Sequence, residues 1–486
     1  MKKENRHIDW KTTLKERLSY CMGFAASVGE SVLFQAWMTT YLLMSGLDVN
    51  VTAIILLIIK TIDAFDDMLF GWIVDRFNPG NNEKLRRFVG TGRFIPWLRL
   101  CFVLMPIAVI LLYHIPSSAS NLFKIVWFCV MYLLADIGYT ILDVPMNALL
   151  TTMTNVSGER DTILTMRSYM MMLIDGAVYL GVTVLISEHI GMSISSAITI
   201  FSFMMVVCML PMIFNVKERA IMDIHEETGQ KMGFLDSLKC LFRNRNLLSY
   251  HLGNLISNCL ATGSAVSLFA SYYLFGDSLF SLILSMPTLI FTAVITAFVP
   301  KLAERYDKNK IRMLCLGISL ITGTLLYLVG YKNIPLYLLL FTLNLIPSGI
   351  AGAISSYLVP NCIEYGKYKT GKDATGISFA LGTFTAKFPG AVQSSLGLWL
   401  LGLYGWVTIE ADSFAQIAAL NIQQSERAIH GLWAITAGYP LIGNVLAFLC
   451  FLFFYKLTDK DASVMALYNT GEISKEEAES RLSRKY

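Results

Sequence analysis

The sequence predicts an all-α protein that crosses a membrane many times. Of its 486 residues, 55% are hydrophobic and only 15% are charged, and the mean hydropathy is +0.55. A soluble chain of this length would carry about 25% charged residues. The apolar residues also come in long runs, and a helix needs about 20 residues to cross a bilayer.

Hydropathy indicates about twelve helical spans. Their approximate centres are Leu33, Leu56, Val109, Met131, Ile174, Met204, Ala261, Leu289, Leu320, Leu343, Thr385 and Leu446. Basic residues gather in alternate connections, at residues 2–17, 76–99, 217–245, 301–312, 367–372 and 456–485. By the positive-inside rule both termini are cytoplasmic, which agrees with an even number of spans. We expect a multi-pass protein of the cell membrane, and no cleavable signal peptide is visible at the start.

A long basic linker divides the predicted spans into two sets of six. We expect a cytoplasmic segment at 1–17, a six-helix bundle at 18–214, a linker at 215–246, a second six-helix bundle at 247–457 and a cytoplasmic tail at 458–486. This layout is typical of the major facilitator fold, whose substrate site lies near the midplane between the halves. The formal charge of +4 comes from the asymmetric loops and gives no reason to expect a nucleic acid partner.

Three carboxylates interrupt the second apolar run, at Asp63, Asp66 and Asp67. Spacings of three and four residues place them on one helix face, where each buried carboxylate costs roughly 3 kcal/mol. The face needs a cation, protons or water, or an ion pair with Lys60 or Lys387, although one lysine cannot neutralise three acids. Three adjacent carboxylates cannot all ionise cheaply, so at least one should hold a proton. This favours H⁺ as the coupling ion, or H⁺ with Na⁺ competing.

Other charged and polar residues also fall in predicted spans. The basic ones are Lys60, Arg167 and Lys387, and the acidic ones outside the cluster are Glu30, Asp143 and, as a further candidate, Asp175. In the fourth span Thr140, Asp143 and Asn147 share a face, and Pro145 frees the backbone carbonyl of Ile141. A hydroxyl, a carboxylate and an amide suit a hard cation and a polyol together, and oxygen ligands select Na⁺ or H⁺ over a soft metal.

Four segments, in order, resemble motifs of the melibiose permease family, the glycoside–pentoside–hexuronide:cation symporters of the major facilitator superfamily. They are Asp-Ala-Phe-Asp-Asp at 63–67 with Gly-Trp-Ile-Val-Asp at 71–75, Gly-Arg-Phe-Ile-Pro-Trp-Leu at 92–98, Tyr-Thr-Ile-Leu-Asp-Val-Pro at 139–145 and Glu-Tyr-Gly-Lys-Tyr-Lys-Thr-Gly at 364–371. The resemblance covers roughly residues 14–457. It implies a cation-coupled sugar transporter that works as a monomer, and no enzyme.

The resemblance also implies a role for each matching residue. It assigns the cation, with Na⁺ as one option, to Asp63, Asp67, Thr140 and Asp143, and we add Asp66 to this set. Asp143 would lie between cation and sugar, and Lys387 close to the cation-site acids. The expected substrate contacts are Tyr139, Asp143, Asn147, Arg167, Thr383 and Lys387. Asp66 stands where the family often has Asn, and Asn147 where the melibiose permease has tryptophan, which argues against a galactoside as the sugar.

Three other functions remain as alternatives. A lysolipid carrier on the same fold would need an apolar slot, against which the polar Asn147 and Arg167 argue. A membrane prenyltransferase binds Mg²⁺-diphosphate with Asp-rich helices, but it usually needs a second Asp-rich cluster, and Asp143 stands alone. The third alternative is a sensor or non-transporting scaffold. Accumulation of a sugar in vesicles would distinguish the symporter from all three.

Overall fold

The computed structural model describes residues 10–76, 79, 83–90, 92–154, 156–219, 234–372 and 374–484. Within its helices, the side chains of residues 64–76, 84–85, 88, 157, 234–238, 289, 293, 296, 376 and 380 fall outside the description. The chain divides into two compact units. Unit 1 comprises Met1–Glu226 and Thr408–Gln423, and unit 2 comprises Glu227–Val407 and Gln424–Tyr486.

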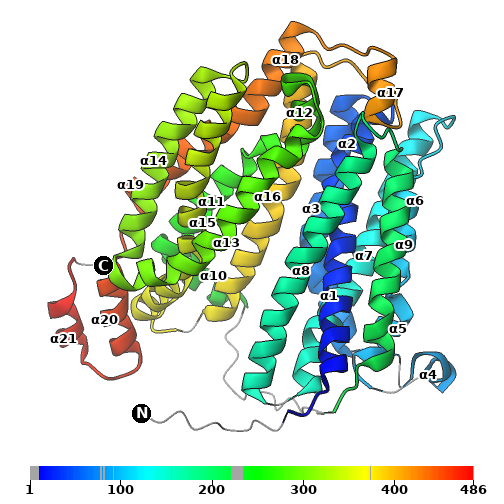
Figure 1. Ribbon diagram of the computed structural model, residues 1–486. Helices are drawn as coiled ribbons and strands as arrows, with labels where there is room; N and C mark the ends of the chain where they lie inside the picture. The colour runs from blue at the N-terminus through cyan, green and yellow to red at the C-terminus, as the bar shows by residue number, and fades with distance from the viewer. Residues whose placement is uncertain are drawn as a thin grey trace. The chain divides into compact units, whose positions relative to one another are not determined.

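Unit 1 is built from long helices that pack side by side (Figure 1). Its helices are α1 (Leu14–Ala36), α2 (Met38–Met44), α3 (Val49–Arg76), α4 (Glu83–Val89), α5 (Ile95–Cys101), α6 (Leu104–Leu112), α7 (Asn121–Met153), α8 (Ser157–Ile186), α9 (Ile194–Asn215) and α17 (Phe414–Ala419). Helix α1 packs against α8 and α9, while α3 and α6 pack against α7. Gly23 permits the close approach of α1 to α9, because a Cβ there would lie 2.4 Å from Cβ of Met212.

Unit 2 contains α10 (Phe234–Arg243), α11 (Arg245–Cys259), α12 (Ser267–Phe275), α13 (Phe280–Arg305), α14 (Lys308–Val329), α15 (Ile334–Thr370), α16 (Thr375–Leu403), α18 (Glu426–Trp433), α19 (Tyr439–Phe454), α20 (Asp459–Asn469) and α21 (Lys475–Arg481). Two short irregular helices join some of these: the 3₁₀ segment η2 (Thr262–Val266) lies between α11 and α12, and the π segment η3 (Ala434–Gly438) lies between α18 and α19.

The helices have the lengths that membrane spans require. Eight helical segments of the described residues are long and apolar enough to cross a membrane, and the bent pair Phe280–Thr292 with Ala297–Arg305 makes a ninth. Helices α1, α3 and α16, with 23, 28 and 29 residues, also have the length of a span. The only strand-type pairing in the described chain is one isolated bridge between Ser45 and Glu410. The prediction of an all-α membrane protein is therefore confirmed.

The two irregular segments of unit 2 pack against each other. The hydroxyl of Thr262 in η2 donates to the backbone carbonyl of Ile435 in η3 at 2.8 Å. Gly263 allows this approach, since a Cβ there would lie 2.8 Å from the carbonyl oxygen of Thr436. Irregular backbone inside a membrane needs such partners, because no water is present to satisfy its polar groups.

One predicted connection begins later than the basic residues suggest. The cluster at 367–372 indicates a connection, but α15 continues to Thr370. The tail folds onto unit 2 (Figure 1). The amide of Asn469 donates to Oε2 of Glu364 at 2.7 Å, and Asp459 accepts from the amide of Asn361 at 2.7 Å.

Candidate functional site

A carboxylate, an amide and a guanidinium form a hydrogen-bonded chain between α7 and α8. The amide nitrogen of Asn147 donates to Oδ1 of Asp143 at 3.0 Å, which the spacing of one helical turn allows. The amide oxygen of Asn147 accepts from Nη1 of Arg167 at 3.2 Å. Asn147 is exposed, while Asp143 and Arg167 are half-buried. The structure therefore brings together three of the predicted substrate contacts, of which Asn147 is exposed.

Arg167 is also held from α1. Its Nη1 lies 3.4 Å from the hydroxyl of Tyr20, and its Cζ lies 4.1 Å from the centroid of the Phe24 ring. The hydroxyl of Tyr20 in turn donates to the backbone carbonyl of Met146 at 3.1 Å. A cation over an aromatic face is stabilised by the ring quadrupole. Tyr20 and Phe24 were missed in the sequence, because nothing in the spacing relates α1 to α8.

Asp63 bonds to a residue that sequence reasoning did not identify. The hydroxyl of Tyr132 on α7 donates to Oδ2 of Asp63 on α3 at 3.1 Å. Asp63 also acts electrostatically on Lys60, one turn earlier on α3. The side chains of Asp66 and Asp67, the other members of the predicted acidic face, lie outside those that the structure describes.

One face of α7 carries buried polar groups at a spacing of four residues. Tyr132, Asp136 and Thr140 are 1%, 3% and 3% exposed. Thr140 was predicted as a cation ligand, whereas Asp136 was overlooked. A carboxylate within an apolar run is the signal that could have found it. The face thus combines a phenol, a carboxylate and a hydroxyl in the element that also carries Asp143.

Glu30, one of the acidic residues expected within a span, is fully buried. Its Oε1 accepts from the hydroxyl of Ser202 on α9 at 2.6 Å. Glu30 therefore joins α1 to α9 inside unit 1.

The predicted residues of unit 2 lie on α16. Thr383 is exposed and its hydroxyl donates to the backbone carbonyl of Phe379, one turn earlier, at 3.3 Å. Lys387 is half-buried, one turn further along the same helix. Both residues are thus carried by a single long helix of unit 2.

Unit 2 also contains a buried cation that was assigned to a loop. Arg312 lies in the second turn of α14 and is only 2% exposed. Its Nη2 donates to Oδ1 of Asn254 on α11 at 2.7 Å, and its Cζ lies 3.6 Å from the ring centroid of Phe451. Nε and Nη1 have no hydrogen-bond partner among the described residues. The loop assignment is wrong because hydropathy cannot separate the first turns of a span from the connection before it.

The arrangement in unit 1 favours recognition of a small polar molecule. Arg167 offers directed donors and Asn147 offers both a donor and an acceptor. Asp143 supplies negative charge on the same helix as the polar face at Thr140. Such a set can bind hydroxyl groups and a cation on neighbouring turns.

Comparison with known proteins agrees with this class of protein. The sequence model of the MFS/sugar transport protein family matches residues 19–459, and the chain belongs to that family. It is 24% identical over 471 residues to the glucuronide carrier protein homolog of Escherichia coli K12, covering 94% of each chain. It is 24% identical over 464 residues to the isoprimeverose transporter of Lactiplantibacillus pentosus, covering 93% of this chain and 90% of the other. Other relatives include putative 2,3-dihydroxypropane-1-sulfonate exporters.

Solved structures support the fold. A bacterial homolog of the human lysosomal transporter Spinster superposes with a TM-score of 0.60 at 13% identity, covering 94% of this chain and 97% of the other. The major facilitator fold predicted from the sequence is therefore confirmed, as is a multi-pass membrane protein. These relatives and neighbours are transporters, which excludes the prenyltransferase alternative.

Proposed function

We propose that the protein is a symporter that couples movement of a sugar to that of H⁺ or Na⁺ by alternating access. The sugar class is a glycoside, pentoside or hexuronide. The observation that carries the proposal is the hydrogen-bonded chain from Asp143 through Asn147 to Arg167. It links a carboxylate that can respond to a cation with a guanidinium that can hold substrate hydroxyls.

Coupling of cation binding to sugar binding follows from the position of Asp143, which would contact both. A cation near Asp63, Thr140 and Asp143, with Asp66 and Asp67 as further ligands, would offset the negative charge of these acids. Asn147 and Arg167 would then be freer to turn toward the sugar. By linkage, a sugar that prefers this arrangement also tightens the binding of the cation. One charge crossing 100 mV supplies about 2.3 kcal/mol.

Tyr139, Thr383 and Lys387 complete the proposed substrate set. We assign Lys387 the role of a counter-ion for the acids when the cation is absent. The protein would act as a monomer in the cell membrane, with both termini in the cytoplasm. The basic connections listed above support this orientation through the positive-inside rule.

Uptake by proteoliposomes tests the proposal. A panel of radiolabelled glycosides, pentosides and hexuronides is offered under separate Na⁺ and H⁺ gradients. We expect accumulation of at least one sugar, driven by one of the two gradients, and loss of accumulation in Asp63→Asn. Asp175→Asn is the matched control, because it makes the same change in a span without touching the chain at Asn147. If no sugar accumulates, the symporter proposal fails; if Asp63→Asn still concentrates substrate, the cation assignment fails.

A further inference from the structure

A large pocket in unit 2 collects positive charge at the ends of three helices. It has a volume of about 1110 Å³ and lies beside the start of α11, the end of α15 and the end of α19. Its charged lining residues are Arg243, Arg245, Lys369, Lys456 and Arg484. No carboxylate occurs among the described residues that line it.

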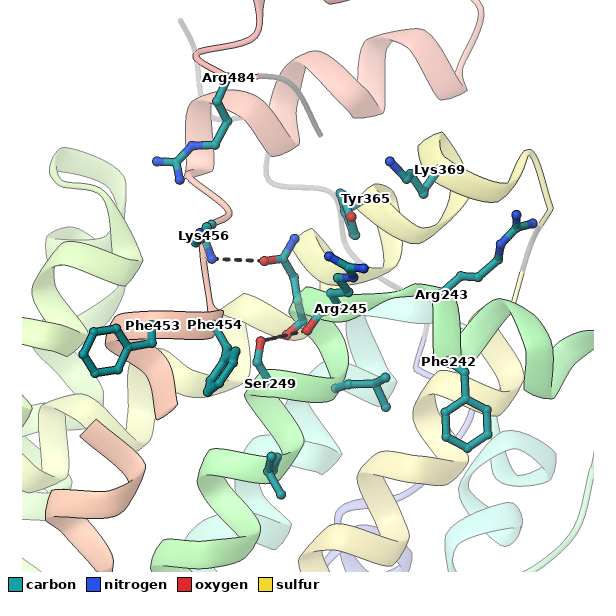
Figure 2. Close-up of a pocket in the computed structure, with 13 residues that line it drawn as sticks. Phe242, Arg243, Arg245, Ser249, Tyr365, Lys369, Phe453, Phe454, Lys456 and Arg484 are labelled. Atoms are coloured by element: carbon teal, nitrogen blue, oxygen red, sulfur yellow. Dashed lines mark hydrogen bonds between the residues drawn. The ribbon is translucent and has the colours of Figure 1, made fainter. Parts of the chain in front are cut away.

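Aromatic and aliphatic side chains lie directly next to this charge. Figure 2 shows the rings of Phe242, Phe453 and Phe454 below the basic groups. These three rings are 64%, 61% and 65% exposed. Helix α11 begins at Arg245 and α19 ends at Phe454, so the boundary between charged and apolar side chains coincides with the ends of spans.

Part of the pocket is supplied by the tail. The buried carboxylate of Asp461 accepts from the backbone nitrogen of Ser483 at 2.7 Å and from the hydroxyl of Ser483. These bonds hold the segment after α21, so that Arg484 lies near Lys456 (Figure 2). The charge on Arg484 is thus positioned by a folded contact within unit 2.

We propose that this pocket binds the phosphate headgroup of an anionic phospholipid. The basic groups lie at the ends of helices that are long and apolar enough to cross a membrane, and the exposed rings lie beside them. In a bilayer this order would match a headgroup followed by its acyl chains. Clusters of Lys and Arg at this level recognise anionic headgroups. Scattered positive-inside residues would not require a shared pocket or a tail residue held at its edge. The pocket shares no residue with the proposed sugar site, and this proposal does not depend on that one.

Lipid binding to the purified, delipidated full chain tests the proposal. Phosphatidylglycerol or phosphatidylcholine is titrated in mixed micelles, and bound lipid is counted by native mass spectrometry. We expect phosphatidylglycerol to bind more tightly than phosphatidylcholine. In Arg243→Gln/Lys369→Gln/Arg484→Gln the affinity for phosphatidylglycerol should fall by about fivefold for each charge removed. These three side chains are exposed, so their replacement leaves the core intact.

The matched control is Lys301→Gln/Arg305→Gln/Lys310→Gln, which removes the same charge from exposed positions of unit 2 outside the pocket. It should bind phosphatidylglycerol as the unaltered protein does. If both variants lost the same affinity for phosphatidylglycerol, the effect would be one of general charge, and the proposed site would be wrong. Equal binding of phosphatidylcholine would exclude recognition of the anionic headgroup. Competition by inorganic phosphate at the concentration of the lipid would identify a soluble anion as the occupant, and the lipid proposal would fail.

Discussion

Tyr132 on α7 donates a hydrogen bond from its hydroxyl to Oδ2 of Asp63 on α3, across 3.1 Å. This contact joins the helix with the acidic cluster to the helix with Thr140 and Asp143. Because Tyr132 is 1% exposed, its hydroxyl has little access to water and the bond is protected. The pair fixes the orientation of the one cluster carboxylate whose side chain the structure describes.

Tyr132→Phe removes this donor and leaves the ring in place. A hydrogen bond to a charged group contributes about 1.5–3 kcal/mol, so the cation concentration for half-maximal uptake should change by about tenfold or more. The measurement is sugar uptake across a series of Na⁺ concentrations and of pH values. Tyr113→Phe is the control: its hydroxyl donates to the backbone carbonyl of Leu33, so its loss should lower stability without altering cation dependence. An unchanged cation dependence in Tyr132→Phe would remove Tyr132 from the coupling.

Arg167→Lys keeps the positive charge but loses the planar fork that reaches Asn147 and Tyr20. We expect KM for the sugar to rise by about tenfold. Asn147→Ala should also raise KM, and the double variant should be less impaired than the sum of the two, because both remove the same contact. If the free-energy changes calculated from KM add strictly in the double variant, Asn147 and Arg167 act on the substrate independently.

Asn254→Ala removes the acceptor for the buried guanidinium of Arg312. Leaving a buried charged donor unpaired costs about 2 kcal/mol or more, so the thermal midpoint in detergent should fall by several degrees. Arg312→Met fills the same space without a charge, and the double variant should recover much of the loss. Equal destabilisation of Asn254→Ala with and without Arg312→Met would show that Asn254 acts through another contact.

Gly263→Ala places a methyl group 2.8 Å from the carbonyl oxygen of Thr436 and should push η2 away from η3. Overpacking of this kind costs about 1–3 kcal/mol, which thermal unfolding of the purified protein can measure. Gly390→Ala on α16 is the control, since nothing lies within 4 Å of its added Cβ. If the two variants unfold at the same temperature, the contact between η2 and η3 contributes little to stability.

The helical class and its spans could be predicted because hydropathy and length are local properties of the chain. The shared face of Asp143 and Asn147 followed from helix periodicity, and their hydrogen bond agrees with it. Contacts between helices could not be read in this way. No spacing relates Tyr132 to Asp63, and a role for Arg167 in sugar binding was predicted only from the resemblance to a known family.

Two misassigned residues show the limits of averaging hydropathy over a stretch of sequence. Asp136 was overlooked because the apolar residues around it dominate the local hydropathy, although it is 3% exposed. Arg312 was grouped with neighbouring basic residues in a connection, although its burial depends on Asn254 and Phe451, which are distant in sequence. The positions of single side chains depend on such tertiary partners.

The hydrogen bond from the backbone nitrogen of Ser483 to Asp461 has a practical consequence for handling the protein. A purification tag or fluorophore attached close after Arg484 would begin beside the basic pocket and could mask it. A long polar spacer avoids this difficulty. Lipid dependence measured on a closely tagged chain would then report partly on the tag.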